Sequence, residues 1–75
     1  MRFELVQPGE YYEYFYNIVD DDGFKYGEIR YDKQGWRVPF LFRVYYLCDG
    51  DFINIANKIT ELNAATKADK LFGFL

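Results

Sequence analysis

The stretch FKYGEIRYDKQGWRVPFLF, residues 24–42, contains two segments rich in aromatic and β-branched residues on either side of Gln34-Gly35. Glycine readily adopts the positive φ of a tight hairpin turn, so this pair favours a two-residue loop. Such a loop predicts three cross-strand pairs: Tyr31 with Val38, Ile29 with Phe40, and Gly27 with Phe42. A three-residue loop would place charged Arg30 opposite Val38. We therefore expect a β-hairpin with a two-residue loop here.

Two more glycine-containing turn signals lie on the N-terminal side of this hairpin, at Pro8-Gly9 and Asp22-Gly23. The three turns separate four β-prone segments: residues 2–7, 11–21, 24–33 and 36–47. The simplest topology that joins them is a four-stranded antiparallel meander. Pro39 has no N–H to donate to a strand ladder, so the last strand is expected to be a sheet edge or to carry a bulge.

Gly27 stands in the interior of the third predicted strand. With a two-residue turn at Asp22-Gly23, Ile18 pairs with Gly27 and Tyr16 pairs with Ile29. A glycine inside a strand often marks a close approach of neighbouring groups. We therefore expect no room for a side chain at this position of the core face.

The sequence DGD at residues 49–51 is typical of a helix start, because either aspartate can accept hydrogen bonds from the first N–H groups. Five apolar residues then follow at helical spacing: Phe52, Ile55, Ala56, Ile59 and Leu62. The helix either ends at Asn63 or continues to a stop at Gly73. One amphipathic C-terminal helix on one face of the sheet gives a two-layer α+β fold, with residues 1–75 as a single domain.

The predicted register divides the strands between two faces. The face under the helix contains Tyr12, Tyr14, Tyr16, Ile18, Ile29, Tyr31, Trp36, Val38, Phe40, Phe42, Val44 and Tyr46. The other face, where Asp32 is expected opposite Arg37, has no predicted cover. Its candidate partner-interface residues are Phe15, Tyr26, Arg30, Arg37, Leu41, Arg43 and Tyr45, because Tyr, Phe and Arg are enriched where interfaces are buried. Two alternatives are that LFGFL (residues 71–75) folds over this face, or that arginine stems shield its rings.

Composition excludes several kinds of site. The chain has neither histidine nor serine, which removes Ser–His and Cys–His dyads and imidazole metal ligands. The run Asp20-Asp21-Asp22 does not fit an EF-hand loop, since Ile18 and Ile29 stand where that loop needs carboxylates. We expect a solvated turn there, and no catalytic, cofactor or metal site in the chain. The net charge of −3 makes duplex DNA an improbable partner.

Cys48 is the only cysteine, so the fold has no internal disulfide, and this favours the reducing cytoplasm. The longest apolar run, residues 38–47, is too short to span a membrane. Cys48 itself is expected to be buried.

These observations predict a small non-enzymatic protein-interaction module, of a regulator or inhibitor type common among phage and mobile-element proteins. Its partner is another protein, and we expect it to form a homodimer through the uncovered sheet face. The alternative is a protein that binds single-stranded nucleic acid or nucleotides by stacking, and a carboxylate-based enzyme comes third.

Overall fold

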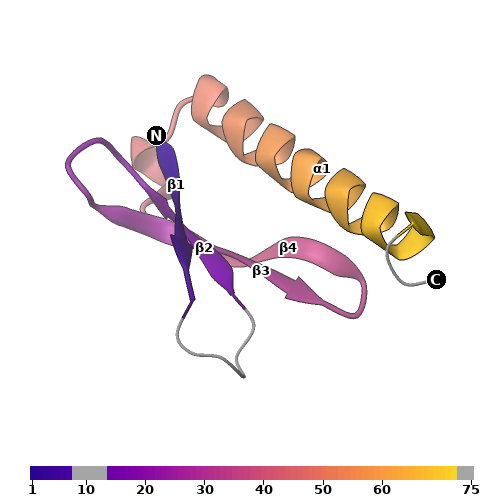
Figure 1. Ribbon diagram of the computed structural model, residues 1–75. Coiled ribbons are helices and arrows are strands. Elements are labelled where there is room, and N and C mark those ends of the chain that lie inside the picture. Colours follow the sequence, from indigo (N-terminus) through magenta and orange to yellow (C-terminus); the bar gives the residue numbers. More distant parts are fainter. Residues whose placement is uncertain (8–13, 73–75) are drawn as a thin grey trace.

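The chain forms a twisted antiparallel sheet with one long helix across one face (Figure 1). The computed structural model describes residues 1–7 and 14–72, with side chains described for 1–7 and 14–66. The elements are β1 (Arg2–Val6), β2 (Phe15–Val19), β3 (Lys25–Asp32), β4 (Gly35–Leu41), the 3₁₀ helix η1 (Val44–Tyr46) and α1 (Asp49–Phe72). The strands lie in the order β1-β2-β3-β4, and all neighbours are antiparallel. The predicted meander and the α+β class are confirmed.

The turn between β2 and β3 is closed by Asp20. Its Oδ1 accepts hydrogen bonds from the N–H groups of Asp22 and Phe24, both at 2.9 Å. Its backbone carbonyl accepts a third from Gly23, whose φ is 91°. The turn signal PG lies at residues 8–9, outside the described residues.

β3 carries one extra residue where it pairs with β2. Ile18 pairs with Gly27 as predicted, but the next residue, Val19, pairs with Lys25. Tyr26 is therefore left without a partner on β2 in a β-bulge, and its side chain is buried on the helix side. The prediction that Tyr26 lies on the uncovered face is wrong for this reason.

The β3–β4 hairpin has a two-residue loop, but it is formed by Lys33 and Gln34, since Asp32 pairs with Gly35. Gly35 follows the loop with φ at 119°. The register near the loop pairs Tyr31 with Trp36 and Arg30 with Arg37. The predicted pair Tyr31–Val38 is therefore wrong by two residues.

A second bulge then changes which face the end of β4 presents. Opposite Ile29, β4 has two residues, Val38 and Pro39, so Gly27 pairs with Leu41 instead of Phe42. The missing N–H of Pro39 suits this place on an edge strand. Leu41 packs against the core, which corrects its predicted place on the uncovered face. The rings of Phe40 and Phe42, predicted to lie in the core, are exposed and stack on each other.

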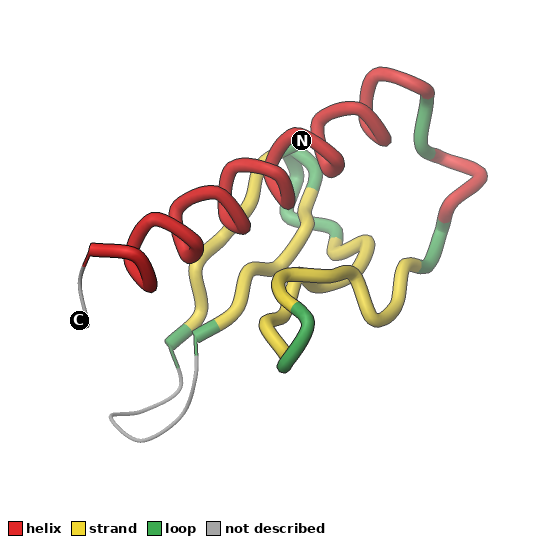
Figure 2. Tube along the Cα trace, turned by 90° about the vertical axis from the view of Figure 1, so that its right-hand side faces the viewer, coloured by secondary structure: helices red, strands yellow, loops and turns green. Residues whose placement is uncertain are grey.

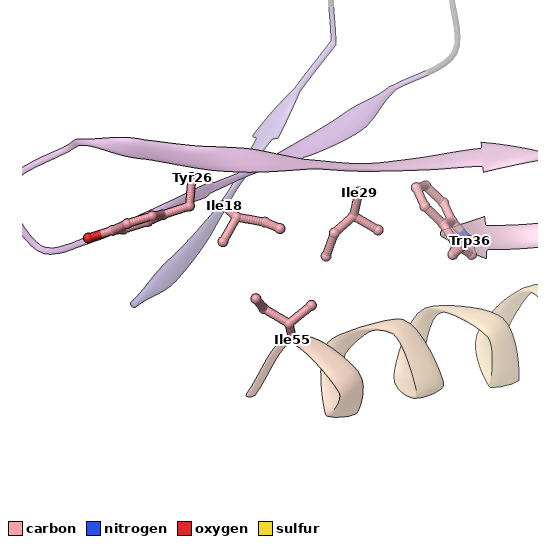
Figure 3. Close-up of a cluster of buried hydrophobic side chains, with 5 residues drawn as sticks. All are labelled: Ile18, Tyr26, Ile29, Trp36 and Ile55. Atoms are coloured by element: carbon pink, nitrogen blue, oxygen red, sulfur yellow. The ribbon is translucent and has the colours of Figure 1, made fainter. Parts of the chain in front are cut away.

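The core lies between the helix and the sheet. Ile18 and Ile29 point from the strands toward α1, and Ile55 points back from the helix, with Tyr26 and Trp36 at the two ends of this cluster (Figure 3). Partly buried apolar side chains surround this cluster: Met1, Phe3, Tyr16, Tyr31, Val38, Leu41, Leu47, Ile59 and Leu62. Tyr14, predicted to lie in the core, is exposed. The centre of its ring lies 5.5 Å from the centre of the Trp36 ring. Tyr12 lies outside the described residues.

α1 runs along the strands and continues past Asn63 to Phe72, the later of the two predicted ends (Figure 2). Its sheet-facing stripe contains Ile55, Ile59 and Leu62, whereas Phe52 and Ala56 are exposed. The predicted stop at Gly73 lies outside the described residues. Among residues 1–7 and 14–72, no helix combines the length and apolarity needed to cross a membrane.

Asn63 joins the helix to the backbone of the edge strand. Its Oδ1 accepts a hydrogen bond from the Trp36 N–H at 2.7 Å, and its Nδ2 donates to the Trp36 carbonyl at 3.4 Å. One turn further on, Thr66 Oγ1 accepts a hydrogen bond from the indole Nε1 of Trp36 at 3.0 Å. Trp36 is therefore attached to α1 by both its backbone and its ring.

Candidate functional site

The seven residues predicted to form a partner interface separate into three places. Tyr26 and Leu41 lie on the helix side, as described above. Phe15, Arg30 and Arg37 lie together on the uncovered face of the sheet. The remaining two, Arg43 and Tyr45, lie beyond the end of β4.

Phe15, Arg30 and Arg37 form one row across the uncovered face, with Arg30 directly opposite Arg37. The Arg30 guanidinium lies 3.9 Å from the centre of the Phe15 ring, so it covers the ring. Arg37 pairs with Asp32 at 3.0 Å, although the two are not opposite each other as predicted. The expectation that arginine stems shield the rings of this face therefore holds at Phe15. LFGFL, the other predicted cover, extends outside the described residues.

The next row of the same face centres on Glu28, whose residue surface is only 6% exposed. Its carboxylate lies 2.5 Å from Lys25 Nζ and 2.6 Å from Arg30 Nε. Burial alone would raise the pKa of Glu28, but the hydrogen bonds and charges of Lys25 and Arg30 outweigh it and hold the pKa below its ordinary value. The charges on this face are largely paired with one another.

The lowered pKa predicts an acid-dependent contribution to stability. A carboxylate whose pKa is lower in the folded chain stabilises the fold at neutral pH, and this contribution is lost as the pH falls through the folded pKa. We expect Glu28→Gln to lower the free energy of unfolding by about 1–2 kcal/mol at neutral pH, because the cationic partners are half exposed. This difference should shrink as the pH falls below about 4.3, the ordinary pKa of glutamate.

Urea denaturation of both proteins across the acid range measures this difference. Glu61→Gln, which removes an exposed carboxylate from α1, controls for the change in net charge. A Glu28→Gln deficit that stays constant from neutral to acid pH would refute the role assigned to the ionised carboxylate.

A concave pocket lies at the end of the sheet where β4 leads into α1. It has a volume of about 460 Å³, and we call it the aromatic pocket. The residues that line it are Asp20, Phe24, Tyr26, Arg43, Tyr45 and Tyr46. They come from the β2–β3 turn, the Tyr26 bulge and the connection after β4. Two irregular segments far apart in sequence thus form one surface.

Three of the four rings that line this pocket are strongly exposed, and the fourth, that of Tyr26, is buried. The exposed fraction is 80% for Tyr45, 68% for Tyr46 and 54% for Phe24. The 3₁₀ helix places the two tyrosines, since the Tyr46 N–H donates to the Arg43 carbonyl at 3.0 Å. Arg43 has φ at 58°, a left-handed conformation that is uncommon outside glycine. Its guanidinium lies 5.3 Å from the centre of the Phe24 ring.

The one carboxylate that lines the pocket is already engaged. Asp20 accepts two backbone hydrogen bonds at Oδ1, as described, and its Oδ2 lies 3.4 Å from the Tyr26 hydroxyl that donates to it. Burial would raise the pKa of Asp20, but the hydrogen bonds from Phe24, Asp22, Tyr26 and Gly23 lower it. Burial and the charge of Asp20 raise the pKa of Tyr26. Asp20 is therefore an ionised turn residue, as the solvated-turn interpretation predicts.

More exposed apolar side chains flank the aromatic pocket in sequence. They are Phe40, Phe42, Val44, Phe52 and Ile53. Sequence reasoning included Arg43 and Tyr45 but missed Phe24 and Tyr46. The available signal was the aromatic run at residues 40–46 directly after Pro39, which exceeds what one face of a regular strand can bury.

No group of three or more potential ligands among the described residues is placed to hold a metal ion.

Cys48, predicted to be buried, is exposed, because it stands at the start of α1. Its backbone N–H and its thiol both donate to Asp51 Oδ2, at 3.0 and 3.4 Å. These hydrogen bonds lower the pKa of Asp51. The aromatic pocket thus presents exposed rings and one guanidinium.

Comparisons with known protein families, characterised proteins and solved structures found no match to this chain.

Proposed function

We propose that this chain is a non-enzymatic protein-interaction module that binds its partner through the aromatic pocket and the apolar side chains around it. One observation carries the proposal. Ten large apolar side chains are exposed among the described residues, and eight of them are Phe24 or fall within residues 40–53. Three of these eight, Phe24, Tyr45 and Tyr46, line the aromatic pocket together, and exposed apolar side chains that gather in one place usually mark an interaction site.

The composition of this surface supports a protein partner. Tyrosine and arginine are enriched among the residues that anchor protein interfaces, and aromatic residues in general are enriched in interface cores. Arg43 lies among the rings here. A small module of this kind acts by occupying the surface of its partner. That action fits a regulator or an inhibitor.

Self-association is part of the proposal, and we place its contact not on the sheet face but on the aromatic surface, by which we mean the aromatic pocket together with Phe40, Phe42, Val44, Phe52 and Ile53. The arginines of the sheet face, Arg30 and Arg37, each pair with a carboxylate of the same chain. The aromatic surface has more exposed rings than the sheet face has. Burying them in a homodimer would stabilise a domain of this size.

The acidic groups favour binding over catalysis. Asp20, Glu28 and Asp51 are the carboxylates of the described residues whose pKa departs from the ordinary value, and each is lowered. A carboxyl group that works as a general acid near neutral pH needs the opposite shift. The enzyme hypothesis therefore gains no support from them.

Single-stranded nucleic acid is the second candidate partner. The rings of Phe40 and Phe42 are nearly parallel, at 6°, and Lys25 lies 5.9 Å from the centre of the Phe40 ring. Bases stack on such rings. The acidic residues of the neighbouring turn and helix start oppose a phosphate backbone, so we place this candidate below a protein partner.

The single cysteine is relevant to the cellular compartment in which the protein resides. Cys48 is exposed, and its thiol has no second cysteine to pair with in the chain. An unpaired exposed thiol fits a reducing compartment, and we therefore propose a cytoplasmic location.

The test compares the wild-type chain with Tyr45→Asp/Tyr46→Asp. Light scattering measures self-association, selection from a random-peptide display library measures peptide binding, and a gel shift with labelled single-stranded oligonucleotides measures the second candidate. We expect the wild type to self-associate or to enrich peptides, and the double variant to do neither. Leu5→Asp, which alters an exposed apolar side chain outside the surface, is the matched control.

A wild type that stays monomeric, enriches no peptide and retards oligonucleotides would overturn the module in favour of nucleic-acid binding. Equal loss of binding in the Leu5→Asp control would show that the aromatic surface is not the site.

A further inference from the structure

We infer that the aromatic pocket recognises an aspartate or glutamate side chain that stands next to an apolar residue within a segment of the partner protein, and that Arg43 is the group that selects it. This inference rests on the proposed function and names the chemistry of the partner.

Arg43 differs from the other arginines of the chain in its pairing. Arg2, Arg30 and Arg37 each lie within 3.3 Å of a carboxylate oxygen. Among the residues whose side chains are described, none forms an ion pair with Arg43. Its guanidinium lies against the Phe24 ring instead. The pocket therefore contains one cation whose donors are available to a ligand.

The nearest candidate partner within the pocket does not use those donors. Both carboxylate oxygens of Asp20 accept hydrogen bonds from the β2–β3 turn and from Tyr26. Asp20 closes the turn that carries Phe24, so the hydrogen bonds of this turn fix the orientation of the Asp20 carboxylate. Among the side chains that the structure describes, none supplies the acid that would complement Arg43, and we assign that acid to another molecule.

The backbone at Arg43 is held in an uncommon conformation that aims the side chain into the pocket. Arg43 is the non-glycine residue with positive φ among the described residues. Such a conformation is strained, and it persists where the surroundings or a function require it. Here it begins η1, and its carbonyl accepts the hydrogen bond from Tyr46. The same backbone turn therefore positions the guanidinium and the two exposed tyrosines.

The charges around the pocket define which anion fits. Asp21 and Asp22 follow Asp20 in the turn, and Asp49 and Asp51 begin α1. These carboxylates disfavour a ligand with several negative charges, such as a phosphate backbone. A ligand with a single carboxylate can pair with Arg43 and brings no second negative charge into these acidic surroundings. A guanidinium binds a carboxylate through two parallel hydrogen bonds.

The volume and the lining of the aromatic pocket indicate which side chain stands beside the carboxylate in the partner's segment. A space of about 460 Å³ between exposed rings accepts an apolar side chain beside the carboxylate. Capture of a chain terminus uses a cradle of backbone N–H groups, whereas the anion partner here is a side-chain guanidinium. We therefore commit to an internal acidic residue.

The experiment uses peptides selected from a random-peptide display library on the wild-type chain. The tightest peptide is synthesised with its acidic residue intact and with that residue replaced by the matching amide. Each form is titrated against the wild type, Arg43→Gln and the control Arg37→Gln. The fluorescence of Trp36, the only tryptophan, reports that each variant is folded.

We expect the selected peptides to carry an acidic residue next to an aromatic or aliphatic one. Replacing that acid by its amide should weaken binding about tenfold or more on the wild type and on Arg37→Gln, and by less than about twofold on Arg43→Gln. This pattern assigns the carboxylate to Arg43.

Peptides that bind without an acidic residue, or that lose the same affinity on Arg43→Gln as on the wild type, would overturn this inference and leave the interaction module standing. A library that yields no peptide over the Tyr45→Asp/Tyr46→Asp background would overturn this inference, and a wild type that also stays monomeric would overturn the interaction module as well. A selected peptide that single-stranded oligonucleotides displace from the wild type but not from Arg43→Gln would assign the guanidinium to phosphate instead.

Discussion

We expect Trp36→Ala to leave the chain largely unfolded at room temperature. Trp36 is 5% exposed, and its ring lies 5.5 to 5.8 Å from those of Tyr14, Tyr16 and Tyr31. Replacing a buried tryptophan by alanine costs about 3–5 kcal/mol. A core of this size rarely supplies more than about 3–5 kcal/mol in total, so the two quantities nearly cancel. The Thr66 hydroxyl still donates to the Leu62 carbonyl, but the lost hydrogen bond that it accepts from the indole N–H adds to the destabilisation.

Circular dichroism and urea denaturation measure the outcome. Trp36→Phe, which retains a ring but loses the indole N–H, should give a midpoint between those of Trp36→Ala and the wild type. Tyr45→Ala removes a ring that is 80% exposed and should change the free energy of unfolding by no more than about 0.5 kcal/mol. A wild-type midpoint for Trp36→Ala would mean that the helix does not pack on this end of the sheet.

Gly27→Val is the second substitution with a large expected effect, a loss of about 1–3 kcal/mol in the free energy of unfolding. A Cβ atom at this position would lie 2.5 Å from the backbone carbonyl oxygen of Phe40 and 3.1 Å from Leu41 Cδ1. The carbonyl belongs to the neighbouring strand, so the clash is relieved only by moving β4 away from β3. Gly27→Ala should already show part of the loss for the same reason.

The control for this substitution is Gly50→Ala. Gly50 lies in the first turn of α1, and the nearest atom to an added Cβ is Cys48 Sγ at an ordinary 3.7 Å. Alanine is the better helix former, so we expect an unchanged or slightly raised urea midpoint. If Gly27→Val matched this control, the close approach of β3 and β4 would not exist in solution.

The sequence was sufficient to predict the order and the direction of the strands. Glycine-containing turns and short β-prone segments define a meander whatever the exact register. The predicted pair of Ile18 with Gly27 is confirmed, but the predicted two-residue turn is wrong: Asp20 faces Phe24 across a longer turn, and the bulge at Tyr26 restores the register. The two bulges were not predictable in the same way. Alternation identifies a face only when polar and apolar residues alternate, and Phe40, Leu41 and Phe42 are all apolar.

The candidate site depended on those bulges. Tyr26 turned toward the core because an extra residue in β3 rotates its side chain, and no residue type marks that event in the sequence. Asn63 is one of the two helix ends that the sequence allows, yet α1 continues past it and its side-chain amide hydrogen-bonds the backbone of Trp36. Arg43 and Tyr45 were selected for their residue types, and their shared pocket with Phe24 arises only in three dimensions.

The meander also sets the order of folding events. Each strand pairs with its neighbour in sequence, so the hairpins close short loops and can form within microseconds. The hydrogen bonds from Trp36 to Asn63 and Thr66 span 27 and 30 positions, and closing longer segments costs more chain entropy. We therefore expect the β2–β3 and β3–β4 hairpins to precede the docking of α1, and the fluorescence of Trp36 to follow that last step.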